Sequence, residues 1–332
     1  MGICISIASS NIQEDKDGHE DAVFHRTSIV SNEIGSVYSQ QGSKGLNQDA
    51  AVLLQGYAME DGAFCGVFDG HGKIGHEVSK KVRNHLPALV LGQKNALAKI
   101  GNVTNDSGER IDDELLGSNK EFLMWKEACL NAFKVMDKVI KLDERLDSFS
   151  SGTTAVIIIK QGRDLIIANL GDSRAVLGTI TEDGLMAIQL TTDLKPDLAK
   201  EADRIRRSNG RIFAFKAEPH IQRVWLPHDD YPGLAMSRAF GDFVLKNHGI
   251  IVTPDVSYRH LASEDQFIVL ATDGVWDVLN NDQVASIVWQ ATSEETAAKA
   301  VVDAAKDAWK LKFPSAKVDD CSVVCLFFKR KA

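Results

Sequence analysis

Two apolar runs of the sequence end in an aspartate followed by a glycine. The run AFCGVFDG places Asp69 at its end, and FIVLATDG places Asp273 at its end. Asp319 and Asp320 stand directly before a third apolar run, CSVVCLFF. A carboxylate at the end of a buried strand is costly unless a charged group compensates it. Three such positions, distant in sequence, are what a metal centre assembled across a sheet needs, and oxygen ligands without a His or Cys cluster favour Mg²⁺ or Mn²⁺ over Zn²⁺.

The composition is that of a globular chain. Its 332 residues are 44% hydrophobic, with 25 glycines and 7 prolines, so the chain can bury a sizeable core. A formal net charge of −8 argues against a general nucleic-acid binder, which needs an excess of Lys and Arg on at least one face. The five cysteines show neither a CxxC pair nor a zinc-like spacing. We therefore expect reduced thiols and a cytoplasmic or nuclear protein.

The first residues, MGICIS, fit the N-myristoylation pattern, with Gly2 as the acceptor and Ser6 at the required position. One acyl chain gives only marginal membrane binding, and the acidic residues that follow add no polybasic signal. Attachment to the plasma membrane would therefore also need a palmitoyl group on Cys4. The alternative is an unmodified tail. Residues 1–33 are polar and aperiodic, which predicts a flexible N-terminal extension.

The next part of the chain alternates short strands with helices. Strands are predicted over SVYSQQG, DAAVLLQGY and AFCGVFDG, followed by a helix over about 73–91 that ends near Gly92. A loop is expected over 101–118 because the segment is rich in Gly, Asn and Asp. Apolar residues then recur every three or four positions from Phe122 to Ile140, which predicts one long amphipathic helix.

After this helix the pattern changes to β-branched runs. TTAVIIIK, DLIIANL and SRAVLG read as strands, with Gly171 and Asp172 as a hairpin turn between the last two. Continuous apolar runs of this kind indicate strands that are covered on both faces. Residues 197–208 look helical, and the proline-containing segment 209–233 is predicted to be irregular. The sequence therefore predicts a surface flap over about 197–233.

The last third of the chain repeats the alternation. It contains the strand QFIVLATD, helices around 281–291 and 294–312, and the closing strand SVVCLFF. Strand groups that alternate with helix pairs indicate an α+β fold rather than a doubly wound α/β fold. We expect a four-layer α/β/β/α sandwich, in which two packed, mainly antiparallel sheets are flanked by helices.

Seven motifs stand in the order seen in the metal-dependent Ser/Thr protein phosphatases of type 2C. They are VFDGHG, SGTTAV, NLGDSRAVL, LTTDLKP, LAMSRAFGD, ATDGVWD and DDCSVV. The resemblance covers about residues 35–329, and KGLNQD and RVWLPHDDYPGLAMSRAFGD are most similar to the plant branch of the family. It implies a catalytic domain over 34–332 that hydrolyses phosphoserine and phosphothreonine in phosphorylated proteins, kinases among them.

The resemblance also implies a two-metal centre. Asp69 would bridge two Mg²⁺ or Mn²⁺ ions, with the carbonyl of Gly70 on one ion and Asp273 and Asp319 on the other. A water that bridges the two ions would then attack the phosphorus. Two further aspartates resemble the ligands of a third, weaker ion: Asp193 and Asp277.

Three more residues take roles from the resemblance. His71 is similar to the group that protonates the leaving Ser or Thr oxygen, which a histidine can do near neutral pH. Asp49 would hold metal-bound water. Asp242 resembles a motif aspartate near the metal site, and the sequence gives it no definite role.

Two positions depart from the family pattern, and a third departs from one group of plant relatives. Lys44 stands where most members have an arginine that grips the substrate phosphate, so the cation is kept without the guanidinium fork. Gln48 stands where a glutamate is usual, which removes one negative charge and predicts a higher metal requirement. The plant relatives that abscisic acid receptors inhibit have a tryptophan at the place of His220, so we do not expect regulation by those receptors.

Two other functions compete with a protein phosphatase. A membrane-tethered binding module would keep the fold and lose turnover through Lys44 and Gln48. The intact Asp69, Asp273 and Asp319 argue against it, because a degenerate scaffold has no reason to keep costly carboxylates at strand ends. A metallohydrolase of small phosphoesters would use the same centre, and competition with phosphopeptides would separate it from a protein phosphatase.

Overall fold

A computed structural model describes residues 21–26, 34–103 and 113–328 of the protein. The proposed lipidation sites, Gly2 and Cys4, lie outside these ranges. The four cysteines that are described are buried and form no disulfide: Cys65, Cys129, Cys321 and Cys325. No helix within the described ranges is long and apolar enough to cross a membrane.

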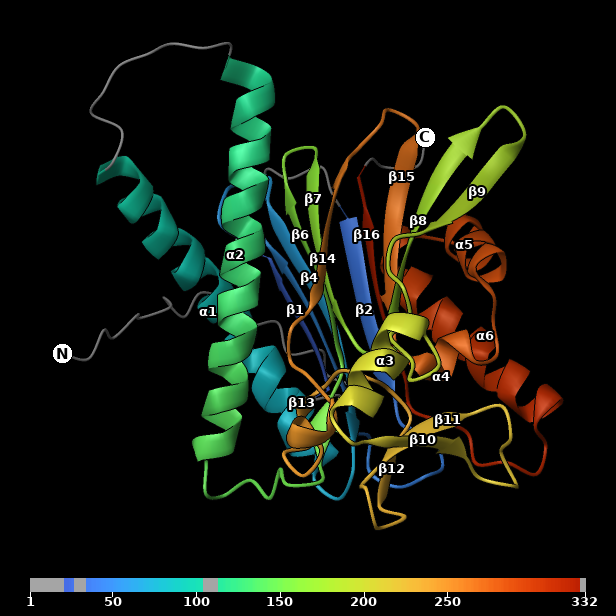
Figure 1. Cartoon of the computed structure of the whole chain (residues 1–332). Helices are drawn as coiled ribbons and strands as arrows, with labels where there is room; N and C mark the ends of the chain where they lie inside the picture. Colours follow the sequence, from blue (N-terminus) through green and yellow to red (C-terminus); the bar gives the residue numbers. More distant parts are fainter. Residues whose placement is uncertain (1–20, 27–33, 104–112, 329–332) are drawn as a thin grey trace.

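Two sheets pack face to face between two layers of helices (Figure 1), which confirms the predicted α+β sandwich. The larger sheet follows the order β1 (Ala22–Arg26), β3 (Asp49–Gln55), β4 (Ala63–His71), β6 (Ala155–Gln161), β7 (Asp164–Leu170) and β14 (Asp255–His260), with β5 (Gly152–Thr153) and β13 (Phe240–Gly241) attached beside β4. The second sheet follows the order β2 (Ile34–Gln40), β16 (Cys321–Phe327), β15 (Asp265–Ala271), β8 (Arg174–Thr181) and β9 (Gly184–Gln189). Every pairing is antiparallel except that of β1 with β3.

Helices α1 (Gly75–Val103) and α2 (Asp113–Leu142) cover the larger sheet, and α5 (Asn281–Gln290) and α6 (Ala297–Lys312) cover the second one (Figure 1). The strand β4 shows why its apolar run is continuous. Its Phe64 and Phe68 pack into the core beneath α1 and α2, whereas Cys65 and Val67 pack into the core between the two sheets. Alternate side chains point to opposite faces of a strand, so a strand in this layer is apolar at nearly every position.

Several predicted boundaries are wrong. Residues 22–26, placed in a flexible extension, form β1 and pair in parallel with β3. The helix α1 does not end near Gly92 but continues to Val103 along α2, where Lys94 pairs with Glu121 at 3.0 Å and lies 5.3 Å from the centroid of the Trp125 ring. The helix α2 already begins at Asp113, so the loop predicted over 101–118 is shorter.

The predicted hairpin at Gly171 and Asp172 is also wrong. β7 pairs with β6 and β14 in the larger sheet, whereas β8 pairs with β15 and β9 in the second sheet. Gly171, with φ of 112°, therefore lies where the chain crosses from one sheet to the other. Two apolar strands around a Gly-Asp turn look alike in sequence whether or not they pair with each other.

The predicted flap contains α3 (Ala199–Arg207) and a three-stranded sheet of its own, β10 (Arg211–Ala214), β11 (Gln222–Trp225) and β12 (Pro232–Leu234). The irregular structure predicted over 209–233 is thus wrong for these strands. Pro219 and Pro227 lie between strands, and Pro232 begins the edge strand β12, where proline is tolerated. Phe213 stacks on Trp225 with ring centroids 4.7 Å apart, and Trp225 is 1% exposed.

The carboxylate of Glu201 anchors the flap to the rest of the domain. It accepts hydrogen bonds from Arg204, from Ser237 and twice from Arg238, at 2.6 to 2.9 Å, and its side chain is 3% exposed. Burial alone would raise the pKa of Glu201, but these hydrogen bonds outweigh burial and lower the pKa from 4.5 to about 2. The network ties α3 to the segment that leads into β13.

We expect the substitution Glu201→Gln to lower the free energy of unfolding by about 3 kcal/mol at pH 7, because it leaves two half-buried guanidinium groups short of a counter-charge. A carboxyl group with a lowered folded-state pKa stabilises the fold above its unfolded pKa and loses this effect as the pH falls. The difference between wild type and variant should therefore shrink from about pH 4.5 towards pH 2. Urea unfolding at several pH values measures it.

Glu218→Gln is the matched control. Glu218 pairs with Arg223 at 2.8 Å in the same flap, but its side chain is 45% exposed, and such surface pairs contribute about 1 kcal/mol or less. Equal losses in the two variants would refute the assignment of Glu201 as the anchor.

Candidate active site

The three aspartates of the strand-end motifs approach one another at one end of the sandwich. Asp69 lies two residues before the end of β4, Asp273 begins the short helix α4 (Asp273–Trp276) after β15, and Asp319 lies two residues before β16. Burial raises the pKa of Asp69 well above its usual range, and repulsion from Asp273, Asp49 and Asp319 raises it further. Burial and the charge of Asp273 likewise raise the pKa of Asp319. The sequence prediction that these three residues come together is thus consistent with the structure.

Asp49 lies beside Asp69. The two residues face each other across the β3–β4 ladder, and Asp49 is 1% exposed. Its Oδ2 accepts a hydrogen bond of 2.8 Å from Thr272, the residue before Asp273. Burial raises the pKa of Asp49 well above its usual range, with repulsion from Asp320 as the next cause. Asp320 itself holds the adjacent loop, since it accepts hydrogen bonds from the backbone of Gly42 and Gln48.

One further buried carboxylate, that of Asp172, was not predicted from the sequence as part of this site. Asp172 is 3% exposed, and its Oδ1 has no hydrogen-bond partner within the described part of the chain. Burial and the charge of Asp273 raise the pKa of Asp172 to about 7, although Lys195 opposes this. The signal was its motif, NLGDSRAVL, which was interpreted as a hairpin turn.

One of the two aspartates predicted for a third ion, Asp193, is paired with an arginine. The carboxylate of Asp193 accepts hydrogen bonds from Nε and Nη2 of Arg174, at 3.0 and 2.6 Å. Its charge is therefore already balanced, whereas Asp277, at the end of α4, is exposed to solvent. The structure favours Asp172 over Asp193 as the neighbour of Asp273 and Asp277.

We call the set Asp49, Asp69, Asp172, Asp273, Asp277 and Asp319 the acidic cluster. The described residues contain no group of three or more His, Cys, Asp or Glu side chains that could hold a metal ion in its present arrangement. The chemistry of the donors nevertheless fits a hard divalent cation, because they are all oxygens. The fit is supported by the repulsion among buried carboxylates and by the unpartnered Oδ1 of Asp172. A cation between these side chains would relieve both.

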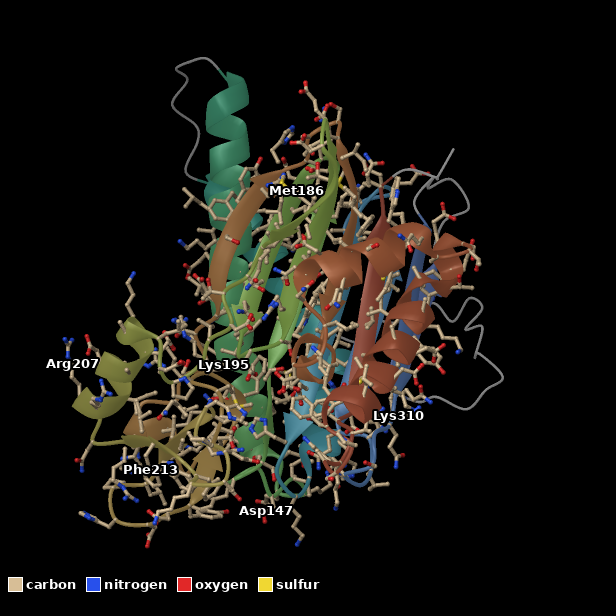
Figure 2. All side chains as sticks on the ribbon, turned by 90° about the vertical axis from the view of Figure 1, so that its right-hand side faces the viewer. Asp147, Met186, Lys195, Arg207, Phe213 and Lys310 are labelled. Carbon is tan, nitrogen blue, oxygen red and sulfur yellow. The ribbon has the colours of Figure 1, made fainter. Side chains whose placement is uncertain are left out.

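Two lysines flank the acidic cluster. Lys44 forms an ion pair with Asp319. Burial disfavours the charged form of Lys44, but attraction to Asp319, Asp273 and Asp69 is larger in sum and raises its pKa. On the other side, Lys195 lies 4.0 Å from Asp172. In Figure 2, Lys195 lies closer to the sheets than Arg207 and Phe213, which are on the flap.

The backbone around Asp69 is held by two of the other motifs. The amide of Asp69 donates to Thr154 Oγ1 at 3.1 Å, and the amide of Thr154 donates to the carbonyl of Asp69 at 2.9 Å. The hydroxyl of Thr154 also contacts that of Ser173 at 2.9 Å. Gly70 has no room for a side chain, because a Cβ would clash with the carbonyl oxygens of Gln48 and Gly75. These contacts fix the end of β4.

His71 points to Asp242. Its Nε2 lies 2.6 Å from Asp242 Oδ2, and its Nδ1 is buried without a hydrogen-bond partner among the described residues. Burial disfavours the imidazolium form, but the attraction of Asp242, together with that of Asp172 and Asp273, outweighs burial and raises the pKa of His71. Gly152 makes the contact fit, because a Cβ there would clash with both Asp242 Oδ2 and His71 Nε2. Asp242, which had no definite role in the sequence, thus orients His71.

Gln48 lies on the opposite side of β4 from Gly152. Its side-chain Nε2 donates a hydrogen bond of 2.9 Å to the carbonyl of Gly72, and its backbone carbonyl accepts from the amide of Gly70 and the hydroxyl of Ser79. The side chain and the backbone of Gln48 therefore both brace the segment that carries Gly70 and His71.

Comparison with known proteins places this arrangement in a family. The family model described as "Protein phosphatase 2C" matches residues 36–309. "Probable protein phosphatase 2C 72" of Arabidopsis thaliana is 50% identical, over 100% of this chain and 99% of its own length. "Probable protein phosphatase 2C 12" of Oryza sativa subsp. japonica is 46% identical, over 98% of this chain and 91% of its own length. The crystal structure of a serine-threonine phosphatase 2C from Toxoplasma gondii superposes with a TM-score of 0.75 at 25% identity, covering 89% of this chain and 94% of that one.

Proposed function

Because the chain belongs to the protein phosphatase 2C family, in its plant type, we propose that it hydrolyses phosphoserine and phosphothreonine in proteins by means of divalent cations held in the acidic cluster. The observation that carries this proposal is the convergence of Asp69, Asp273 and Asp319 from three distant segments, with a cation, Lys44, at the edge of the cluster.

We propose that Asp69, Gly70, Asp273 and Asp319 hold two Mg²⁺ or Mn²⁺ ions. Asp277, with Asp172 in place of the predicted Asp193, suits a third and weaker one, since both lie near Asp273. When bound, such ions lower the pKa of a water molecule and neutralise charge on the phosphoryl group.

The residues of the chain supply binding and proton transfer. Lys44 can leave Asp319 for a phosphate oxygen of the substrate, because half of its side chain surface, 51%, is exposed. Asp49, held by Thr272, is placed to orient a water beside Asp69. The water oxygen bonds to phosphorus as the P–O bond to the Ser or Thr side chain breaks. His71, oriented by Asp242, gives its proton to the departing oxygen, and the proton lost by the water restores His71 through solvent.

From the sequence we also propose where the protein lies in the cell and which substrates it acts on. Gly2 and Cys4 would carry a myristoyl and a palmitoyl group that attach a cytoplasmic or nuclear phosphatase to the plasma membrane. Kinases are among the phosphorylated proteins it would act on.

The substrate class is tested by comparing two peptides of one sequence, one with phosphothreonine and one with phosphotyrosine, in the presence of Mn²⁺. We expect the phosphothreonine peptide to release phosphate at least about tenfold faster, and to compete with p-nitrophenyl phosphate. Failure to compete would favour a hydrolase of small phosphoesters. Binding of the phosphopeptide without any turnover by folded protein would favour the binding module.

Gln48 gives a prediction about the metal requirement. Glu cannot donate to the carbonyl of Gly72, so in Gln48→Glu the new carboxylate is free to face the acidic cluster. We expect the Mn²⁺ midpoint for activity to fall roughly three- to tenfold, because one negative charge is added near the ions. Gln290→Glu, which adds the same charge on the exposed end of α5, is the control. Equal midpoints for wild type and Gln48→Glu would contradict the prediction.

A further inference from the structure

The turn that presents Asp242 to His71 has an unusual backbone. Gly241 has a φ of 73° and Asp242 a φ of 51°. A non-glycine residue rarely adopts the second value, and such a conformation persists only where the surroundings hold it. The position of the Asp242 carboxylate therefore depends on whatever fixes this turn.

A carboxylate of the outer helix layer fixes it. Asp137 of α2 accepts a hydrogen bond of 2.9 Å from the amide of Gly241 and pairs with Lys246 Nζ at 3.1 Å. The same Nζ donates to the carbonyl of Ala239 at 2.7 Å. Asp137 thus ties together the residues before and after Asp242. Figure 1 shows β13 beside the lower part of α2, and Phe240 of β13 contacts Phe133 of α2, with ring centroids 5.0 Å apart.

The turn is in register with His71. Gly241 pairs with Gly152 across β13 and β5, and Gly152 pairs with His71 across β5 and β4. The three residues form one row, and the Asp242 carboxylate reaches over Gly152 to His71 Nε2. A shift of Gly241 along this row would move Asp242 relative to the imidazole.

The ion pair between Asp137 and Lys246 is a poor source of folding stability. The side chains of Asp137 and Lys246 are 13% and 18% exposed. Burial raises the pKa of Asp137 and lowers that of Lys246, and their mutual attraction does not fully offset either shift. Replacing such a pair by apolar groups is often neutral or stabilising. A positioning role accounts for a buried pair at this place better than stability does.

We propose that Asp137 is a positioning residue for proton transfer to the leaving group. Through Gly241 and Lys246 it holds Asp242 where that carboxylate orients His71. This inference rests on the proposed function, because it requires His71 to protonate the departing Ser or Thr oxygen.

The test compares two leaving groups. A threonine alkoxide needs a proton in order to leave, whereas p-nitrophenolate does not, so loss of a well-placed acid affects the first substrate selectively. We expect Asp137→Asn to lower kcat on the phosphothreonine peptide roughly tenfold, with KM and the Mn²⁺ midpoint unchanged, and kcat on p-nitrophenyl phosphate by less than about threefold. Lys246→Met should behave in the same way and serves if the first variant does not fold.

Asp143→Asn is the matched control. Asp143 directly follows α2 and pairs with Lys81 and Arg145, without a contact to β13, and the substitution should leave both substrates unaffected. The decisive measurement is Asp137→Asn in a His71→Asn background, where its effect should vanish because residues that act as a unit are not additive. An undiminished effect in that background, or equal losses on both substrates, would overturn the inference. A wild type that releases no phosphate from the phosphothreonine peptide would instead refute the proposed function.

Discussion

Asp69→Asn should reduce Mn²⁺-dependent release of phosphate from a phosphothreonine peptide by roughly a thousandfold or more, about 4 kcal/mol in the barrier. Asparagine has nearly the same shape but no charge. Within the acidic cluster, Asp69 interacts with three other carboxylates, namely Asp49, Asp273 and Asp319. Its loss should therefore weaken the binding of every ion in the proposed pair.

Stability separates this effect from misfolding. Because burial and repulsion raise the pKa of Asp69, removing its charge should leave the chelator-treated protein as stable as wild type or more stable. We expect the thermal midpoint in chelator to stay or rise while activity is lost. Asp183→Asn, in another Asp-Gly turn between β8 and β9, is the control and should keep full activity. Activity that survives in Asp69→Asn would contradict the prediction.

His71→Asn should lower kcat on the phosphothreonine peptide by about a hundredfold and kcat on p-nitrophenyl phosphate by less than about tenfold. The imidazole of His71 lies beside the acidic cluster. Its Nε2 is paired with the carboxylate of Asp242, and its Nδ1 is buried without a partner among the described residues. General acid catalysis contributes about 10² to 10⁴ in rate and matters most for a basic leaving group. Steady-state kinetics on both substrates measures the ratio.

Asp242→Asn should show the same selectivity with a smaller loss, since it acts through His71. Losses of equal size on the two substrates in His71→Asn would mean that His71 supports the site in another way, for example by bracing β4.

Much of the proposed site could be predicted because its residues stand where local pattern is strongest. Asp69 and Asp273 end apolar strands, and a carboxylate in that position signals a compensating charge from sequence alone. The layer order was predictable for a related reason. Each central strand lies between the other sheet and a layer of helices, so both of its faces are covered and apolar.

The differences between prediction and structure concern residues whose surroundings depend on distant partners. Asp172 was missed because a Gly-Asp turn does not reveal whether its two strands pair with each other. Asp193 was preferred because nothing in the sequence shows that Arg174 binds it. Gly92 was taken as a helix end, although contacts of the next turn with α2, through Lys94, override the weak helix propensity of glycine. The role of Asp242 depends on a contact with His71, 171 residues away in the chain.

The central claim, that the acidic cluster is a divalent-metal centre, is tested most directly by calorimetric titration of Mn²⁺ into chelator-treated, full-length protein. We predict saturable binding by wild type, and strongly weakened binding by Asp69→Asn at unchanged fold. The same affinity and stoichiometry in both proteins would place the metal elsewhere. That result would contradict the account.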